Sequence, residues 1–214
     1  ISNTYRLFEW LAKYAEKDPN KEIIREGTHA LVMLIAPFAP HTAEELWSGI
    51  GEKGFVSMAQ WPNANTRFID KKAERGEELV EQTISDIRNI QQLVKIEKVK
   101  KITILVSPKW KWDALSIVQD ACNDRPDYGA ALKALFNSPF KRYAKELEGF
   151  AKQAVRIAPD SGTSVQLDEE KLFLENKKRF QNEFDAIIEV VSAEKSQNPK
   201  ARNAFPFKPA IVIE

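Results

Sequence analysis

The fold of this chain is decided by residues 35–47, whose sequence is IAPFAPHTAEELW. Pro37 and Pro40 force the chain out of one helix, because each proline fixes φ and lacks a backbone N–H donor. We predict that Thr42 then begins the next helix as a capping box with Glu45, ahead of an apolar pair. A buried helix, a rigid corner and a second helix therefore follow one another, and the stretch contains no catalytic motif.

Apolar residues recur at helical spacing on both sides of this corner. We predict helices at 2–17, 22–36, 42–49 and 70–96, with a loop at 51–66. The last turns of the second helix, residues 30–35, are apolar on every side and should lie inside a bundle. The apolar stripe of the long helix consists of Val80, Ile84, Ile87 and Val94.

The pattern changes at Val99, where short runs rich in β-branched residues appear. We predict strands at 101–106, 186–191 and 210–213. Helices are expected at 110–122, 128–136 and 140–155, and another that Asp168 caps and that ends near Phe184. Ser107-Pro108 should supply the N-cap and first-position proline of the helix at 110–122. A turn is expected at 159–164 and a polar loop at 194–203.

These elements indicate an α+β fold that is mostly α. We predict two domains: a partial helical bundle at 1–97, and a small α/β domain with about three strands at 98–214. A chain of 214 residues has room for one large or two small domains.

The charge balance argues against a domain that wraps nucleic acid by charge alone. The chain has 32 basic and 31 acidic residues, a formal net charge of +1, whereas such domains carry a basic stripe. Phosphate contacts depend on placement, however, so local basic clusters can still bind RNA.

The remaining composition favours a cytoplasmic protein. Cys122 is the single cysteine, which excludes an internal disulfide and fits a reducing compartment. The longest apolar run, residues 30–39, is far shorter than the roughly 20 residues of a membrane span, so no membrane contact is expected. Ile1 is not a natural initiator, and we expect the chain to be a piece of a longer protein.

No constellation for catalysis or metal binding is present in the sequence. The two histidines, His29 and His41, have no spacing typical of a metal site. No phosphate loop, nucleophile elbow or dinucleotide fingerprint occurs. Glu44 and Glu45 are better explained by helix capping and the helix dipole than by acid–base chemistry. We therefore predict no active site, no metal and no cofactor in this chain.

Basic residues gather at several places that can contact nucleic acid. The first cluster is Lys95, Lys98, Lys100 and Lys101, where the long helix passes into the first strand. The second is Lys177, Lys178 and Arg179, late in a helix, where cations also suit the dipole. A third group, Lys200, Arg202 and Lys208, flanks the aromatic hook NAFPF at 203–207. The alternative for the hook is that Phe205 and Phe207 complete the core.

The stretch Lys109-Trp110-Lys111-Trp112 alternates charge with aromatic rings. In a helix the two tryptophans cannot share a face, so we predict that Trp112 is buried and Trp110 lies nearer the surface. There Trp110 could stack on an unpaired base, a contact worth about 1–3 kcal/mol. Alternatively, Trp110 packs on a neighbouring element and the lysines are only solvated.

Two parts of the chain resemble class I aminoacyl-tRNA synthetases. Residues 22–62 resemble the anticodon-binding helical domain of the leucyl, isoleucyl, valyl and methionyl group. The strand at 101–106, the sequence PKWKW at 108–112 and NAFPFKPA at 203–210 are similar to the C-terminal domain of archaeal and eukaryotic-type leucyl-tRNA synthetases. The catalytic HIGH-like and KMSKS-like motifs of that family do not occur, so the resemblance implies that the catalytic domain lies before Ile1.

The resemblance implies a monomeric module that binds tRNA(Leu), within a parent enzyme that attaches leucine using ATP and Mg. The helical domain would lean on the tRNA body, and the C-terminal domain would reach the long variable arm. Carried onto this chain, the candidates are Arg88, Gln92 and Lys95 on the long helix, with Lys208 and the final Ile211, Ile213 and Glu214 for the variable arm. Glu214 should accept hydrogen bonds from a base edge, because it would repel phosphate.

Two other interpretations remain open at this point. The same helical pattern occurs in the isoleucyl and valyl enzymes, so the chain could be their equivalent fragment. Its balanced charge also fits a helical protein-interaction module.

Overall fold

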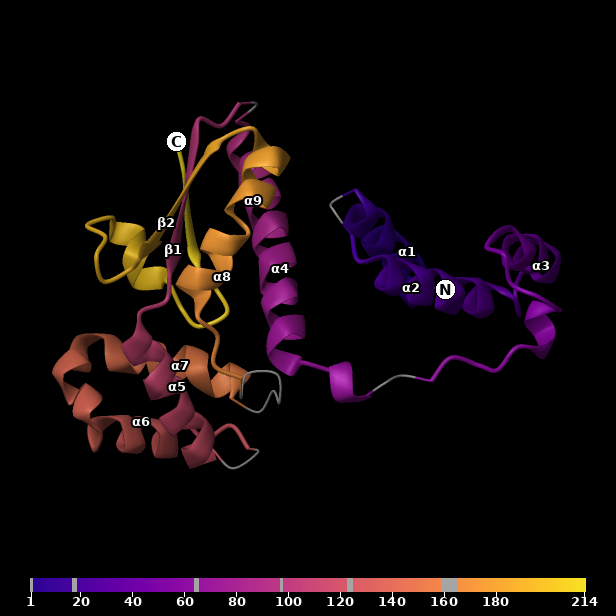
Figure 1. Ribbon diagram of the computed structural model, residues 1–214. Helices are drawn as coiled ribbons and strands as arrows, with labels where there is room; N and C mark the ends of the chain where they lie inside the picture. The colour runs from indigo at the N-terminus through magenta and orange to yellow at the C-terminus, as the bar shows by residue number, and fades with distance from the viewer. Residues whose placement is uncertain (1, 17–18, 64–65, 97, 123–124, 159–164) are drawn as a thin grey trace. The chain divides into compact units, whose positions relative to one another are not determined.

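The computed structural model describes residues 2–16, 19–63, 66–96, 98–122, 125–158 and 165–214 (Figure 1). The chain forms two compact units, Ile1–Ile69 and Asp70–Glu214. The predicted turn at 159–164 lies outside the described residues. No helix in the described ranges is long and apolar enough to cross a membrane.

The first unit is helical, as the sequence predicts. It contains α1 (Ser2–Ala15), α2 (Lys21–Ile35), α3 (Pro40–Gly49) and two short 3-10 turns, η1 (Val56–Met58) and η2 (Thr66–Phe68). Its core joins α2, α3 and η1 through Val32, Met33, Ala43, Trp47 and Val56. The apolar turns at 30–35 are less enclosed than predicted, because only Val32 and Met33 are buried and the others are half-buried.

The predicted capping box at Thr42 is wrong. α3 begins with Pro40 after Ala39, and no side chain caps it. A proline suits this first position because it has no N–H to satisfy. The Glu44 carboxylate instead accepts hydrogen bonds from the backbone N–H groups of Val56 and Ser57, at 2.9 and 3.4 Å, and so fixes η1 to α3.

The second unit combines helices with a three-stranded sheet, which confirms the mostly α, α+β fold class. Its helices are α4 (Lys71–Val94), α5 (Lys109–Cys122), α6 (Tyr128–Phe136), α7 (Ala144–Ile157), α8 (Glu169–Glu175) and α9 (Lys177–Phe184), with 3-10 turns η3 (Pro139–Tyr143) and η5 (Pro199–Asn203). The strands are β1 (Lys101–Val106), β2 (Ile187–Ser192) and β3 (Ala210–Ile213). The sheet order is β2-β1-β3, with β2 parallel and β3 antiparallel to β1.

The sheet is covered on both faces. Ile102, Ile104 and Ile188 belong to the large core, which also contains the α4 stripe and the aromatic rings of α8 and α9. Figure 1 shows α4, α8 and α9 grouped alongside the strands. Part of the other face packs on η5, through Leu105, Ala210 and Val212 against alanines 201 and 204.

Three local expectations for the second unit need correction. Val94 is 58% exposed and leaves the α4 stripe. The expected helix after Asp168 is two helices, because the chain breaks at Asn176, whose amide donates to the Leu172 carbonyl oxygen at 3.0 Å. The expected helix at 140–155 begins as the 3-10 turn η3. The Asp168 cap itself is confirmed, since its carboxylate accepts from the Lys171 N–H.

The two compact units divide before α4, whereas the sequence places a domain boundary after residue 97. The reason is that the buried face of α4, including Val80, Ile84 and Ile87, joins the core of the second unit.

Candidate nucleic-acid interface

One end of the sheet brings the ends of several elements together. Lys101 at the start of β1 lies opposite Ile187 at the start of β2. The chain end reaches the same place, because the N–H groups of Lys100 and Lys101 donate to the Glu214 carbonyl oxygen at 2.9 and 3.0 Å. The first predicted basic cluster and the predicted variable-arm residue Glu214 are therefore neighbours.

The carboxyl end of α4 adds to this group. α4 ends where Lys95 adopts a left-handed conformation, with φ of 54°, and caps the helix through hydrogen bonds to Gln91 and Gln92 carbonyl oxygens. Val99, shortly afterwards, is buried and leads directly into β1. This short connection keeps the end of α4 next to the start of the sheet.

We call this region the α4-end surface. Its members are Gln92, Leu93, Val94, Lys95, Lys98, Lys100, Ile213 and Glu214. All are exposed except Ile213, which is half-buried. Leu93 is 83% exposed, so the surface offers apolar contact beside its cations. Cations can bind phosphates here, and the apolar side chains can contact riboses or bases.

Other cations near this surface are already paired. The Lys101 ammonium lies 2.7 Å from the Glu189 carboxylate, and this hydrogen bond raises the pKa of Lys101 and lowers that of Glu189.

Of the predicted chain-end residues, Ile211 is only 8% exposed, so its side chain packs in the core.

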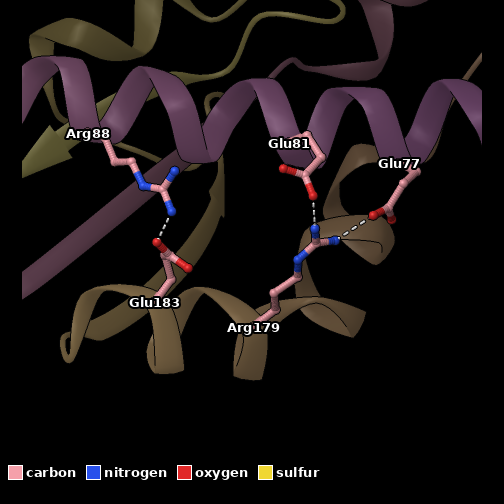
Figure 2. Close-up of polar contacts among 5 residues, drawn as sticks. All are labelled: Glu77, Glu81, Arg88, Arg179 and Glu183. Atoms are coloured by element: carbon pink, nitrogen blue, oxygen red, sulfur yellow. Dashed lines mark hydrogen bonds and ion pairs between the residues drawn. The ribbon is translucent and has the colours of Figure 1, made fainter. Parts of the chain in front are cut away.

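Arg88 and Arg179 are also engaged, by carboxylates on facing helices (Figure 2). Arg179 of α9 contacts Glu77 of α4 at 2.7 Å and pairs with Glu81 one turn further on. Arg88 of α4 pairs with Glu183 of α9. Both arginines therefore link α4 to α9. Beside Arg179, Lys178 is exposed and Lys177 is half-buried.

The prediction for Trp110 is wrong, because both tryptophans of α5 are buried, each 6% exposed. Trp110 stacks on Tyr143 with ring centroids 4.1 Å apart, and it also contacts Phe150. It has this environment because Tyr143 of η3 and Phe150 of α7 lie against it, so α5 has more than one buried face. The alternative, in which Trp110 packs on a neighbouring element, describes the structure.

Lys111 is buried as well, while Lys109 is exposed. The Lys111 ammonium donates to the carbonyl oxygens of Arg202 and Ala204, at 3.0 and 2.7 Å. Burial lowers its pKa, since the charged form loses hydration. Lys111 therefore holds the start of the aromatic hook and is not a solvated lysine.

The aromatic hook completes the core, so the alternative given for Phe205 and Phe207 is the correct one. Phe205 contacts Phe150 at 5.1 Å between ring centroids, and Phe207 meets Trp112 edge-on at 4.7 Å. Around the hook, Lys200, Arg202 and Lys208 are exposed. Lys208 comes just before β3, whose first residue pairs with Leu105, so it lies at the other end of the sheet from the α4-end surface. The Lys200 ammonium donates to the Ile211 carbonyl oxygen at 3.4 Å.

Sequence reasoning missed Glu169, which is only 2% exposed. Its two carboxylate oxygens accept from the backbone N–H groups of Ser107 and Phe207, at 2.9 and 2.8 Å. Burial raises the pKa of Glu169 to about 7, against the opposing effect of these two hydrogen bonds. An acid in the first turn of a helix normally indicates a dipole interaction at the surface, so the sequence carries no signal for this role.

Sequence similarity to known proteins extends along the whole chain. Residues 2–106 match the family model described as the anticodon-binding domain of tRNA ligase. The leucine–tRNA ligase of Pyrococcus abyssi is 30% identical over 100% of this chain, and that of Methanothrix thermoacetophila is 34% identical over 94%. The corresponding enzyme of Methanocaldococcus jannaschii is 29% identical over 98%. The chain spans about 22% of the length of each of these relatives.

Proposed function

We propose that this chain, whose residues 2–106 match the anticodon-binding domain of tRNA ligase, docks tRNA(Leu) for leucylation by a catalytic domain elsewhere in the same protein. The parent protein would join leucine to tRNA with ATP and Mg. This part would position the RNA in the cytoplasm as a monomer, without a cofactor or an active site of its own.

The observation that carries the proposal is the extent of the similarity to leucine–tRNA ligases. The similarity to the Pyrococcus abyssi enzyme extends over 100% of this chain and therefore includes both compact units. The family match alone ends at residue 106, at the end of β1. Leucine specificity is thus supported by the relatives that also match α5 to β3.

The α4-end surface is our candidate for the RNA contact. Lys95, Lys98 and Lys100 are exposed and close to one another along the chain, so together they can bind consecutive phosphates. Gln92 and Glu214 supply acceptors for base edges, and Gln92 also supplies a donor. The surface therefore combines backbone positioning with a limited ability to read bases, which suits recognition of an RNA by its outline.

Gel-shift binding of tRNA(Leu), with and without its long variable arm, tests this proposal. We expect the intact tRNA to bind more tightly, with binding that weakens as salt increases. A Lys95→Ala, Lys98→Ala, Lys100→Ala triple variant should lose most of this affinity. Equal, salt-insensitive binding of both RNAs would contradict a variable-arm role, and tRNA(Ile) binding that depends on its anticodon bases would favour the isoleucyl alternative.

A protein-interaction role has its own support in the first unit. Phe38, Phe55, Met58 and Phe68 are each more than two-thirds exposed, and exposed apolar side chains in such number favour a protein contact. A Phe55→Ser, Met58→Ser variant with unchanged tRNA affinity but a lost protein partner would assign the first unit to protein binding.

A further inference from the structure

A cavity of about 460 Å³ lies in the second unit, away from the α4-end surface. It is lined by Val106 and Ser107, at the end of β1, and by Ser192 and Glu194, at the end of the parallel strand β2. Crevices at the carboxyl ends of parallel strands are common ligand sites, because the connections diverge there. Its volume is in the range of pockets that hold one small organic group.

Ser107 is the unusual member of this lining. The residue is 7% exposed, and its hydroxyl has no hydrogen-bond partner among the described residues. The predicted N-cap role of Ser107 is therefore wrong. Buried hydroxyls are nearly always paired, so an unpaired one in a cavity wall points to a missing partner inside the cavity. A hydroxyl can both donate to and accept from such a partner.

The charges of the lining limit what that partner can be. Lys72, Lys109 and Lys195 are exposed cations around the cavity. Four carboxylates also line it: Asp168, Glu169, Glu170 and Glu194. Both Glu169 oxygens already accept backbone N–H groups and Asp168 caps α8, so Glu170 and Glu194 are the acceptors more open to a ligand.

This combination does not suit a simple anion or an apolar molecule. An inorganic phosphate would use the lysines but meet repulsion from the carboxylates, and an apolar ligand would leave both unpaired. A nucleotide has a phosphate for the lysines and amino or hydroxyl hydrogens for the carboxylates and Ser107. RNA-binding proteins commonly hold unstacked bases in this way.

We propose that this cavity receives one unpaired nucleotide of the bound tRNA, with its base against Ser107 and its phosphate beside Lys109. The inference rests on the proposed function and adds a second, separate contact to it. Together, the α4-end surface and the cavity would hold the RNA at opposite ends of the sheet.

Chemical probing of unpaired nucleotides in tRNA(Leu) bound to the full chain tests the proposal. We expect a Ser107→Ala, Lys109→Ala variant to lose protection at one unpaired nucleotide and to bind about tenfold more weakly. Protection elsewhere should remain. Lys152→Ala, which removes an exposed lysine of α7, is the matched control and should behave as the unsubstituted chain. Lys109→Ala alone serves if the double variant fails to fold.

The possible outcomes separate this inference from the proposed function. An unchanged protection map and affinity in the variant would overturn the cavity but leave tRNA docking intact. A uniform loss of protection at every nucleotide would make Lys109 a general phosphate contact and would also overturn it. Binding of free AMP with an unchanged tRNA map would assign the cavity to a free nucleotide instead. If the unsubstituted chain binds no tRNA(Leu), both proposals fail.

Discussion

At the scale of single residues, two buried ionisable side chains determine how the aromatic hook is held. Glu169 accepts the N–H groups of Ser107 and Phe207, and Lys111 donates to two carbonyl oxygens just before Phe205. Neither side chain pairs with the other's charge. Each instead satisfies backbone groups that would otherwise be buried without partners, and losing one of them is therefore costly.

The pKa of Glu169 makes the stability of the second unit depend on pH. Since folding raises this pKa from 4.5 to about 7, the folded chain binds more protons between these values and its free energy of unfolding falls as pH rises. The full effect is on the order of 3 kcal/mol. We expect the stability advantage over Glu169→Gln, measured by urea unfolding, to shrink from pH 5 to pH 8. A difference that stays constant with pH would contradict this role.

Lys111 should matter for stability far more than its neighbour Lys109. Lys111→Met keeps the apolar stem but leaves the carbonyl oxygens of Arg202 and Ala204 without their donor, at a cost of about 1–3 kcal/mol. Lys109→Met, at an exposed position, should change stability by less than about 0.5 kcal/mol. Equal effects of the two substitutions in urea unfolding would contradict the contacts seen here.

At the scale of secondary-structure elements, α4 has two distinct polar regions. Its middle carries the carboxylates and Arg88 that pair with α9 (Figure 2). Its end is capped by Lys95, whose side chain is exposed. We therefore expect substitutions in the middle of α4 to change stability, and substitutions at its carboxyl end to change RNA binding.

Arg179→Ala and Lys98→Ala test that separation. Arg179→Ala should lower the free energy of unfolding by about 1 kcal/mol, since its partners are half exposed, and should leave tRNA(Leu) affinity unchanged. Lys98→Ala should do the reverse, lowering affinity several-fold with no loss of stability. Unfolding and gel-shift measurements on both variants would contradict the division if Arg179→Ala weakened RNA binding as much as Lys98→Ala.

Most elements of this fold could be predicted because their signals are local. The three strands are short β-branched runs, and Asp168 caps its helix as expected. The predictions failed where a side chain's environment depends on a residue far away in the sequence. Trp110 is buried because Tyr143 of η3 and Phe150 of α7 pack on it, and Glu44 binds the backbone of η1 instead of the amino end of α3.

The candidate site could be predicted only in part, for the same reason. Basic character at Lys95, Lys98 and Lys100 is visible in the sequence, and their proximity to Glu214 follows from how β1 pairs with β3. The pairing of Arg179 with Glu81, 98 positions away, leaves no local signal. The role of Glu169 similarly depends on a contact with Phe207, 38 positions along the chain.

At the scale of the whole molecule, a net charge of +1 limits electrostatic attraction to RNA. If Lys95, Lys98 and Lys100 are the main phosphate contacts, the slope of log K against log salt should be about −2 to −3. This slope follows because each phosphate contact releases about 0.7–0.9 counterions. Binding of tRNA(Leu) measured at salt concentrations between about 50 and 200 mM provides it. A slope steeper than about −6 would require many further contacts.

Ultraviolet crosslinking of tRNA(Leu) to the full chain, with crosslinked peptides identified by mass spectrometry, tests the central proposal most directly. We expect crosslinks between Gln92 and Lys100 and at the chain end near Glu214. Crosslinks confined to the first unit, with none beyond Ile69, would contradict the proposal that the second unit binds the RNA.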